Sequence, residues 1–157
     1  MRIAILTISD AGSRGERADT SGDAAAAWAG DRLVARAIVP DESLAIVQHL
    51  TTWCDDDTAD VVITTGGTGL APRDITPEAT CSVIERHAPG IAERIRWLTG
   101  QDFPRAALGR GVAGIRARTL IVNLPGSTGG VMESLAALES ILDHAVKILR
   151  NEQTDHS

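Results

Sequence analysis

A glycine- and threonine-rich stretch near the middle of the chain, TTGGTGLAPRDITPEAT at residues 64–80, has the composition of a ligand-binding loop. Because glycine has no Cβ, a ligand can closely approach the backbone N–H groups of Gly66, Gly67 and Gly69. Successive N–H groups at the junction of a loop and a helix form a nest that suits phosphate. The stretch is neither a Walker A motif nor a G-x-G-x-x-G dinucleotide fingerprint. Since many glycine-rich stretches are only turns, the loop alone leaves ligand binding undecided.

Asp74 and Asp41 are the acids that could take part in phosphate chemistry. Asp74 follows Arg73 in the loop and precedes Thr76-Pro77, which is typical of a helix start. Its carboxylate could cap that helix or pair with Arg73. Alternatively, it could hold Mg²⁺ or orient a nucleophile at a phosphate site. Asp41 presents the same choice, because Pro-Asp-Glu is also ordinary chemistry for the start of a helix.

Apolar runs and helical spacings predict strands that alternate with helices over most of the chain. We expect strands at residues 2–8, 32–39, 60–65, 112–116 and 119–123. We expect helices at residues 24–29, 40–53, 76–87, 91–99 and 131–149. The segment 9–23 is predicted as a polar loop, and 101–110 carries no clear pattern. This alternation predicts a three-layer α/β/α sandwich with a mostly parallel central sheet, with residues 1–150 as one domain and 151–157 as a flexible tail.

Three polar, glycine-bearing segments follow strands of the expected sheet. Ser9 and Asp10 follow the first strand, residues 65–69 end the third, and residues 123–130 follow the last. Ligands of open parallel sheets bind beyond the carboxyl ends of the strands, so we expect the three segments to converge on one rim. Their joint placement favours a ligand site over a set of plain turns.

The composition argues against several classes of function. The 157 residues carry a formal net charge of −6, which gives no overall attraction to nucleic acid or to an anionic membrane. No apolar run reaches the about 20 residues of a membrane span, and no signal peptide is evident, so we expect a cytoplasmic protein. Cys54 and Cys81 lie outside any metal-ligand spacing and are expected to be buried free thiols. The four histidines form no cluster, and no G-x-S-x-G elbow is present.

The stretch VVITTGGTGLAPRDITPEAT closely resembles the signature of the MogA/MoaB family of molybdenum-cofactor biosynthesis proteins. It is also similar to the gephyrin G domain, to one domain of MoeA-type molybdenum insertases and to the N-terminal domain of CinA proteins. Further matches follow in the same order along the chain: ILTISD, DTSGD, IVPDE, the Pro89-Gly90 step and LIVNLPGSTGGVMESL. The resemblance therefore covers residues 2–150.

The resemblance implies the three-layer α/β fold and the activity of a molybdopterin adenylyltransferase. Such an enzyme uses Mg²⁺ and transfers the adenylyl group of ATP to molybdopterin, with release of pyrophosphate. Asp74 matches the key aspartate of the family and Asp41 a second one, both as catalytic and as Mg²⁺-binding candidates. The substrate-binding positions of the family match Ser9, Asp10, Thr65, Gly66, Gly67, Thr68, Gly69, Asn123, Pro125, Gly126 and Ser127.

The resemblance further implies a homotrimer, or a hexamer, and hand-over of the product to a molybdenum insertase. Two other functions stay open: a MoaB-type carrier that binds molybdopterin without turnover, and a CinA-like hydrolase of nucleotide pyrophosphates. The DTSG motif and the short chain favour MoaB-like members, for which adenylyltransferase activity is less uniformly established than for MogA-like ones. The segment AAAAWAG is short for the helix that precedes the second strand in the family, so we expect a truncated helix there.

Overall fold

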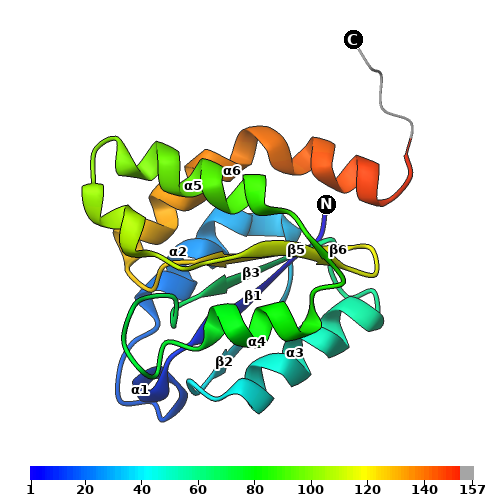
Figure 1. The fold of residues 1–157 in the computed structure, drawn as a ribbon. Coiled ribbons are helices and arrows are strands. Elements are labelled where there is room, and N and C mark those ends of the chain that lie inside the picture. Colours follow the sequence, from blue (N-terminus) through cyan, green and yellow to red (C-terminus); the bar gives the residue numbers. More distant parts are fainter. Residues whose placement is uncertain (153–157) are drawn as a thin grey trace.

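The computed structural model describes residues 1–152, which fold around a six-stranded sheet (Figure 1). The strands are β1 (Ile3–Ile8), β2 (Leu33–Val39), β3 (Val61–Thr65), β4 (Arg86–His87), β5 (Ala113–Arg116) and β6 (Thr119–Leu124). Their order across the sheet is β2-β1-β3-β6-β5-β4. The first four strands in this order run parallel, and β5 is antiparallel to both of its neighbours. The expected mostly parallel sheet is confirmed.

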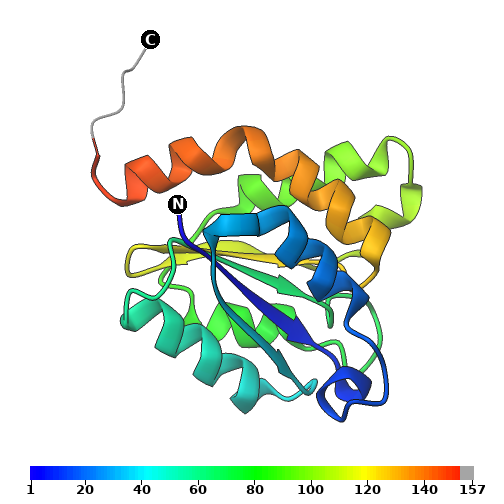
Figure 2. The same ribbon diagram turned by 180° about the vertical axis from the view of Figure 1, so that it is seen from behind.

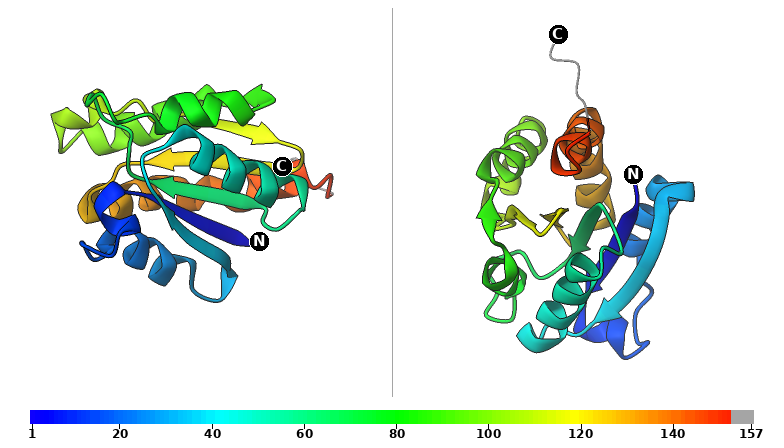
Figure 3. Two further views of the ribbon diagram at one scale, coloured as in Figure 1. Left: turned by 90° about the horizontal axis from the view of Figure 1, so that it is seen from below. Right: turned by 90° about the vertical axis from the view of Figure 1, so that its right-hand side faces the viewer.

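Helices cover both faces of the sheet, as the views along it in Figure 3 show. One face carries α2 (Thr20–Ala29), α5 (Pro89–Gly100) and α6 (Thr128–Leu149). The other face carries α3 (Ser43–Asp55) and α4 (Thr76–Val83). Seen from behind in Figure 2, α2 lies beside α6, with which it is in contact. The shorter helices are α1 (Asp10–Ser13), η1 (Gly30–Arg32) and η2 (Pro104–Leu108). The predicted three-layer α/β/α sandwich is therefore confirmed.

The central strands are buried on both faces, which explains why they appear as continuous apolar runs in the sequence. In β1, Ile3 and Ile5 pack into the core under α2, α5 and α6, whereas Ala4, Leu6 and Ile8 pack against α3 and α4. Successive side chains of a strand point to opposite faces, so each core takes every second residue. Full burial of one isoleucine stabilises the fold by about 1.5–3 kcal/mol. A shift of β1 by one residue would move each side chain to the opposite core. This burial pattern therefore fixes the register of β1 and the place where it ends.

Helix α2 begins earlier than the sequence predicts, at Thr20 instead of residue 24. Asp19 caps it, because its carboxylate accepts a hydrogen bond from the N–H of Gly22 at 2.9 Å. Ser21 and Gly22 are buried in the first turn, and such small residues carry no apolar periodicity. The helix therefore has 10 residues and is longer than the segment 24–29 that the sequence predicts. The polar segment before it also contains α1, which Ser9 caps by accepting from the N–H of Gly12.

Other boundaries differ from the prediction as well. Helix α4 ends at Val83, because residues 86–87 leave the helical path and pair with β5 as the short strand β4. Two residues are too few to show a period in the sequence. Helix α3 begins three residues later than expected, and α5 and α6 begin earlier, at Pro89 and Thr128. Residues 104–108, within the unassigned segment, form η2.

Cys54 is buried as expected, but Cys81 is exposed on α4, so the prediction of two buried thiols was wrong for Cys81. Within the described part of the chain, no helix has the length and hydropathy needed to span a membrane. Residues 153–157 of the expected tail lie outside the described residues.

Candidate functional site

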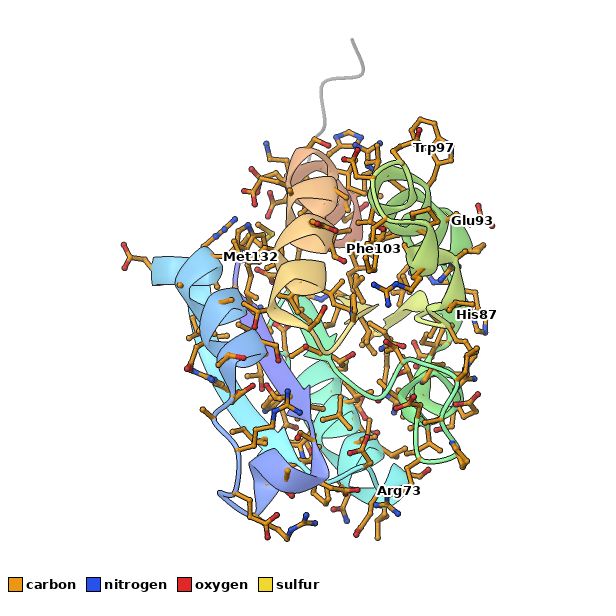
Figure 4. The ribbon with its side chains drawn as sticks, turned by 90° about the vertical axis from the view of Figure 1, so that its left-hand side faces the viewer. Arg73, His87, Glu93, Trp97, Phe103 and Met132 are labelled. Atoms are coloured by element: carbon orange, nitrogen blue, oxygen red, sulfur yellow. The ribbon has the colours of Figure 1, made fainter. Side chains whose placement is uncertain are left out.

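The parallel strands β1, β2, β3 and β6 direct their carboxyl ends to one rim, which faces the viewer in Figure 4. Two cavities open at this rim, a large cavity of 550 Å³ and a small cavity of 170 Å³. Gly126, which follows β6, lines both of them. The two cavities therefore meet at a position without a side chain.

The predicted site residues divide between the two cavities. Asp41 and Ser9 line the small cavity. Four of the predicted residues belong to the segments that form the rim but line neither cavity: Asp10, Thr65, Gly66 and Gly67. The large cavity takes Thr68, Gly69, Asp74, Asn123, Pro125 and Ser127.

Gly66 and Gly67 form the turn by which the chain leaves β3. Their φ angles are 98° and 66°, in the region that side chains other than hydrogen rarely allow. A Cβ on Gly66 would lie 2.2 Å from the carbonyl oxygen of Ile8, so the turn passes directly against β1. The hydroxyl of Thr76 donates to the carbonyl of Gly66 at 2.9 Å and makes no capping bond to α4. Thr76 therefore stabilises the turn; the Thr76-Pro77 pair had suggested a helix capped by this hydroxyl, which is wrong because the N-cap is Ile75.

Asp74 lies at the edge of the large cavity. One of its carboxylate oxygens, Oδ2, accepts from the N–H of Ala71 at 3.0 Å and would lie 2.7 Å from a Cβ on Gly69. The capping position of α4 is taken by Ile75, and Arg73 pairs with Asp10 instead. Neither structural alternative from the sequence, a helix cap or a pair with Arg73, therefore describes Asp74. Its other oxygen makes no hydrogen bond to the described residues, so it is available to a ligand.

Asp41 and Asp10 hold each other at the edge of the small cavity. The N–H of Asp10 donates to the carboxylate of Asp41 at 2.9 Å, and the N–H of Asp41 donates to that of Asp10 at 3.0 Å. Asp41 does not cap α3, whose N-cap is Glu42. Burial raises the pKa of the Asp41 carboxyl, and the negative charges of Asp10 and Asp74 add to the rise.

Arg73 joins the glycine-rich loop to this pair. Its Nε and Nη2 donate to the two carboxylate oxygens of Asp10 at 2.7 and 2.9 Å, and Nη2 also donates to the carbonyl of Asp41. The bidentate bond from Arg73 lowers the pKa of Asp10. Asp10 was predicted as a substrate-binding residue; its carboxylate accepts three hydrogen bonds from Arg73 and the backbone of Asp41, and the substrate-binding role stays a prediction.

Asn123 lines the large cavity and stays a predicted substrate-binding residue, but its side chain is 4% exposed and all of its side-chain polar atoms make hydrogen bonds within the fold. Its amide donates to the hydroxyls of Thr64 and Thr80 at 2.9 and 3.0 Å, and its carbonyl oxygen accepts from the N–H of Val112. Thr65 is buried and donates to the carbonyl of Pro125 at 2.8 Å. These bonds connect β3, α4 and β6 and set the floor of the large cavity.

The segment after β6 leads directly into the longest helix of the fold. Ser127 caps α6 by accepting from the N–H of Gly130 at 3.1 Å. Ser127 and Gly130 both line the large cavity, so the amino end of α6 opens into it. The free N–H groups and positive end of a helix dipole favour an anion there.

The far wall of the large cavity comes from a part of the chain that the sequence left unassigned. Phe103, Arg105 and Leu108 line it from η2 and its N-cap, together with Ile95 of α5. The guanidinium of Arg105 stacks over the ring of Phe103, with its carbon 4.7 Å from the ring centroid. Figure 4 shows Phe103 between α5 and α6, with Arg73 across the rim. This wall suits a flat ring system, and the sequence did not indicate it, because residues 101–110 carry no clear pattern.

The wall of the small cavity comes from the segment before α2 and from the first turn of that helix: Arg17, Ala18, Asp19, Thr20 and Ser21. Burial opposes ionisation of Asp19, but hydrogen bonds from Arg36 and Thr7 outweigh it and lower its pKa. Part of the segment is the DTSG motif quoted above. No local pattern in it marked a cavity wall, because its polar residues resemble those of any loop.

Asp41 and Asp74 are the carboxylates that could hold a divalent cation. The described residues contain no group of three or more His, Cys, Asp or Glu side chains arranged to bind a metal. Mg²⁺ needs no such group, since it is commonly held by one or two carboxylates together with phosphate oxygens and water. Burial is the main cause of the raised pKa of Asp41, and the negative charge of Asp74 adds to it. This donor set fits Mg²⁺ that arrives with a phosphate.

Comparisons with known proteins agree with the sequence motifs. A family model described as "Probable molybdopterin binding domain" matches residues 4–144. The molybdenum cofactor synthesis protein cinnamon of Drosophila melanogaster is 40% identical over 152 residues, which cover 94% of this chain but only 25% of that protein. A molybdopterin adenylyltransferase of Helicobacter pylori (strain J99) is 38% identical over 154 residues, 95% of this chain and 88% of that protein.

Among solved structures, the molybdopterin biosynthesis enzyme MoaB from Thermus thermophilus superposes with a TM-score of 0.90 at 47% identity. The match covers 96% of this chain and 97% of that chain, so no large part of either fold is left over. The family model includes the glycine-rich loop, both aspartates and the start of α6. The chain therefore belongs to the family of molybdopterin-binding domains, as its sequence motifs predicted.

Proposed function

We propose that this protein transfers the adenylyl group of ATP to the terminal phosphate of molybdopterin and releases pyrophosphate. The observation that carries the proposal is the meeting of two unlike cavities at Gly126. The large cavity has an apolar wall that fits a ring, and the small cavity is lined by hydroxyls and acids. Two substrates bound on either side of Gly126 would bring their phosphates together without an intervening side chain.

In the proposed reaction, an oxygen of the molybdopterin phosphate forms a bond to the α-phosphorus of ATP. The bond from that phosphorus to the bridging oxygen breaks, and the electron pair leaves with pyrophosphate. The chain supplies positioning, which can contribute much of the rate enhancement of such a transfer. Thr68 and Gly69 would present hydroxyl and backbone to molybdopterin at the large cavity, and the amino end of α6 would favour its phosphate.

The two acids have different surroundings and, we propose, different roles. Asp74 has a free carboxylate oxygen beside the large cavity and would orient the reacting phosphates. Asp41 is fixed by its bonds with Asp10, so it would contribute a carboxylate in a constant place. Asp41 and Asp74 would together hold Mg²⁺, which neutralises phosphate charge when it is bound. In the absence of a cation, the same carboxylates would repel the phosphates.

The family relationship supports this proposal, since relatives that align with nearly the whole chain are named molybdopterin adenylyltransferase. The test is to incubate the protein with molybdopterin, ATP and Mg²⁺ and to identify the products by chromatography and mass spectrometry. We expect adenylyl-molybdopterin. Tight molybdopterin binding without product would instead indicate a carrier. Hydrolysis of ADP-ribose without adenylyl-molybdopterin would indicate a CinA-like hydrolase.

We further propose that residues 1–150 act as one domain that assembles into a homotrimer and works in the cytoplasm. In this proposal the adenylylated product passes to a molybdenum insertase. Analytical ultracentrifugation tests the assembly, and a sedimentation mass of one chain would contradict it. Hexamers would appear as a second, concentration-dependent species.

A further inference from the structure

One arginine outside the predicted site contacts the glycine-rich loop from the side of the large cavity. Arg110 follows η2 and Gly109, so it is continuous with the cavity wall. We propose that Arg110 is a positioning residue that fixes the loop backbone carrying the Asp74 side chain. This inference rests on the proposed function for its catalytic consequence, but its structural part can be tested separately.

The contacts of Arg110 converge on three carbonyl groups of the loop. Its backbone N–H donates to the carbonyl of Thr68 at 2.8 Å. Its side-chain Nε donates to the carbonyl of Gly69 at 2.8 Å, and Nη2 donates to the carbonyl of Asp74 at 2.6 Å. One guanidinium therefore ties together both ends of the turn that carries the Asp74 carboxylate.

Glu78 on α4 holds the guanidinium in this orientation, through a hydrogen bond and ion pair with Nη1. The hydrogen bond from Arg110, together with its positive charge, lowers the pKa of Glu78. Because the guanidinium is planar, its donors point in fixed directions and can meet two carbonyls and a carboxylate at once. The compact ammonium of a lysine cannot hold all three groups at these positions. The loop geometry thus depends on arginine at this position and on its acidic partner.

Among the described residues, no side chain makes a hydrogen bond or ion pair with the Asp74 carboxylate. Its one hydrogen bond goes to the N–H of Ala71, within the same turn. The position of the carboxylate therefore follows the backbone that Arg110 holds. Arg110 follows η2 in the chain and is bonded to the loop, so it connects the loop to the wall that contains Phe103. A ring bound against Phe103 would therefore be held in a fixed position relative to Asp74.

Arg110→Lys is the test, and Arg116→Lys is a matched control. Arg116 makes the same kinds of contact, with a bidentate pair to Asp55 and a bond to the carbonyl of Val83, but it lines neither cavity. Both variants lose comparable bonds and should lose comparable stability. The readouts are hydrogen exchange of peptides spanning residues 66–76, and kcat and KM for both substrates.

We expect Arg110→Lys to speed exchange in residues 66–76 and to lower kcat about 10- to 100-fold, with KM changed less than about 3-fold. Arg116→Lys should leave both readouts as in the wild type. Glu78→Gln keeps Arg110 and should produce a smaller change in the same direction. Should Arg110→Lys not fold, Glu78→Gln alone carries the test.

Unchanged exchange in the loop of Arg110→Lys, or of Glu78→Gln if it stands alone, would overturn the proposal. Equal loss of kcat in Arg116→Lys would also overturn it, because the effect would then be general destabilisation. If the wild type forms no adenylyl-molybdopterin, the proposed function fails, and the exchange measurement alone decides whether Arg110 positions the loop.

Discussion

At the amino ends of the parallel strands, Asp57 and Asp60 are surrounded by Arg2, Arg118 and Arg150. At the carboxyl ends, the carboxylates of Asp41 and Asp74 have no arginine or lysine within ion-pair distance among the described residues. At the amino ends both acids are therefore paired, whereas at the carboxyl ends Asp10 is paired with Arg73 but Asp41 and Asp74 are not. Paired acids stabilise a fold, whereas acids without a cation beside a cavity are candidates for binding one.

The chain also shows how the unpaired acids are tolerated. Asp41 is held by a backbone N–H and Asp74 by another, so each keeps a hydrogen bond while lacking a counter-charge. Arg73 contacts Asp41 only at its backbone carbonyl, because the side-chain nitrogens of Arg73 donate to the Asp10 carboxylate and to that carbonyl. Neither acid therefore has an ion-pair partner among the described residues, and in the proposed function Mg²⁺ would take that place.

The largest expected effect is on turnover, from Asp74→Asn. The change keeps the shape and the bond to Ala71 but removes the negative charge. We expect kcat for adenylyl-molybdopterin formation to fall about 100-fold or more. The melting temperature should stay within about 2 °C of the wild type, since no ion pair is lost. A variant that keeps more than half of the activity would remove Asp74 from the mechanism.

The counterpart at the other end of the sheet is Asp60→Asn, which should affect stability and not turnover. The Asp60 side chain is 9% exposed and accepts from the backbone and side chain of Arg2, with Arg150 2.5 Å away. Loss of its charge removes an acid that pairs with both Arg2 and Arg150, although Arg150 keeps Asp57, and should lower the free energy of unfolding by about 2 kcal/mol. Urea unfolding measures this change, and kcat at 25 °C is the control. A loss of kcat without a loss of stability would reverse the comparison.

A pH dependence should follow from Asp57. The Arg150 side chain lowers its pKa to about 2. A carboxyl whose pKa is lower in the folded state stabilises the fold above its unfolded pKa of about 4, and this contribution disappears as the pH falls toward 2. Asp57→Asn should therefore be less stable than the wild type at pH 6 and approach it below pH 4. Urea midpoints at several pH values test this, and a difference that grows on acidification would contradict it.

Asp41→Asn should give the smallest change in stability, and the change should be an increase. Burial raises the pKa of Asp41, so its ionised form opposes folding above that pKa, and the opposition is relieved as the pH falls through it. In metal-free buffer at pH 7, we expect the variant to melt at the same temperature or up to about 3 °C higher. At pH 3 the two proteins should melt together. A clear destabilisation at pH 7 would show that Asp41 is a structural acid like Asp60.

The sequence predicted the parts of this molecule that depend on continuous patterns. The strands were evident because β1, β3 and β6 are buried on both faces, and the rule for parallel sheets then placed the polar segments at one rim. The start of α2 was missed because buried Ser21 and Gly22 resemble loop residues. The two-residue strand β4 exists only through its pairing with β5.

The site was predictable where one segment carries it and not where distant segments meet. The glycine-rich loop and Asp74 lie in a single stretch of sequence. The mutual bonds of Asp10 and Asp41 join residues 31 positions apart, and Arg73 joins them from 63 positions away from Asp10. The wall from Phe103 to Leu108 is a 3₁₀ segment without helical or strand periodicity. Such contacts depend on the register of the sheet, which no local pattern contains.

The most direct test of the proposed function is pyrophosphate release from ATP and Mg²⁺, measured with and without molybdopterin. We expect pyrophosphate to appear only when molybdopterin is present, in an amount equal to the adenylyl-molybdopterin formed. Asp60→Asn should behave as the wild type in this assay, and Asp74→Asn should not. Pyrophosphate release without molybdopterin, or none with both substrates present, would contradict the proposed function.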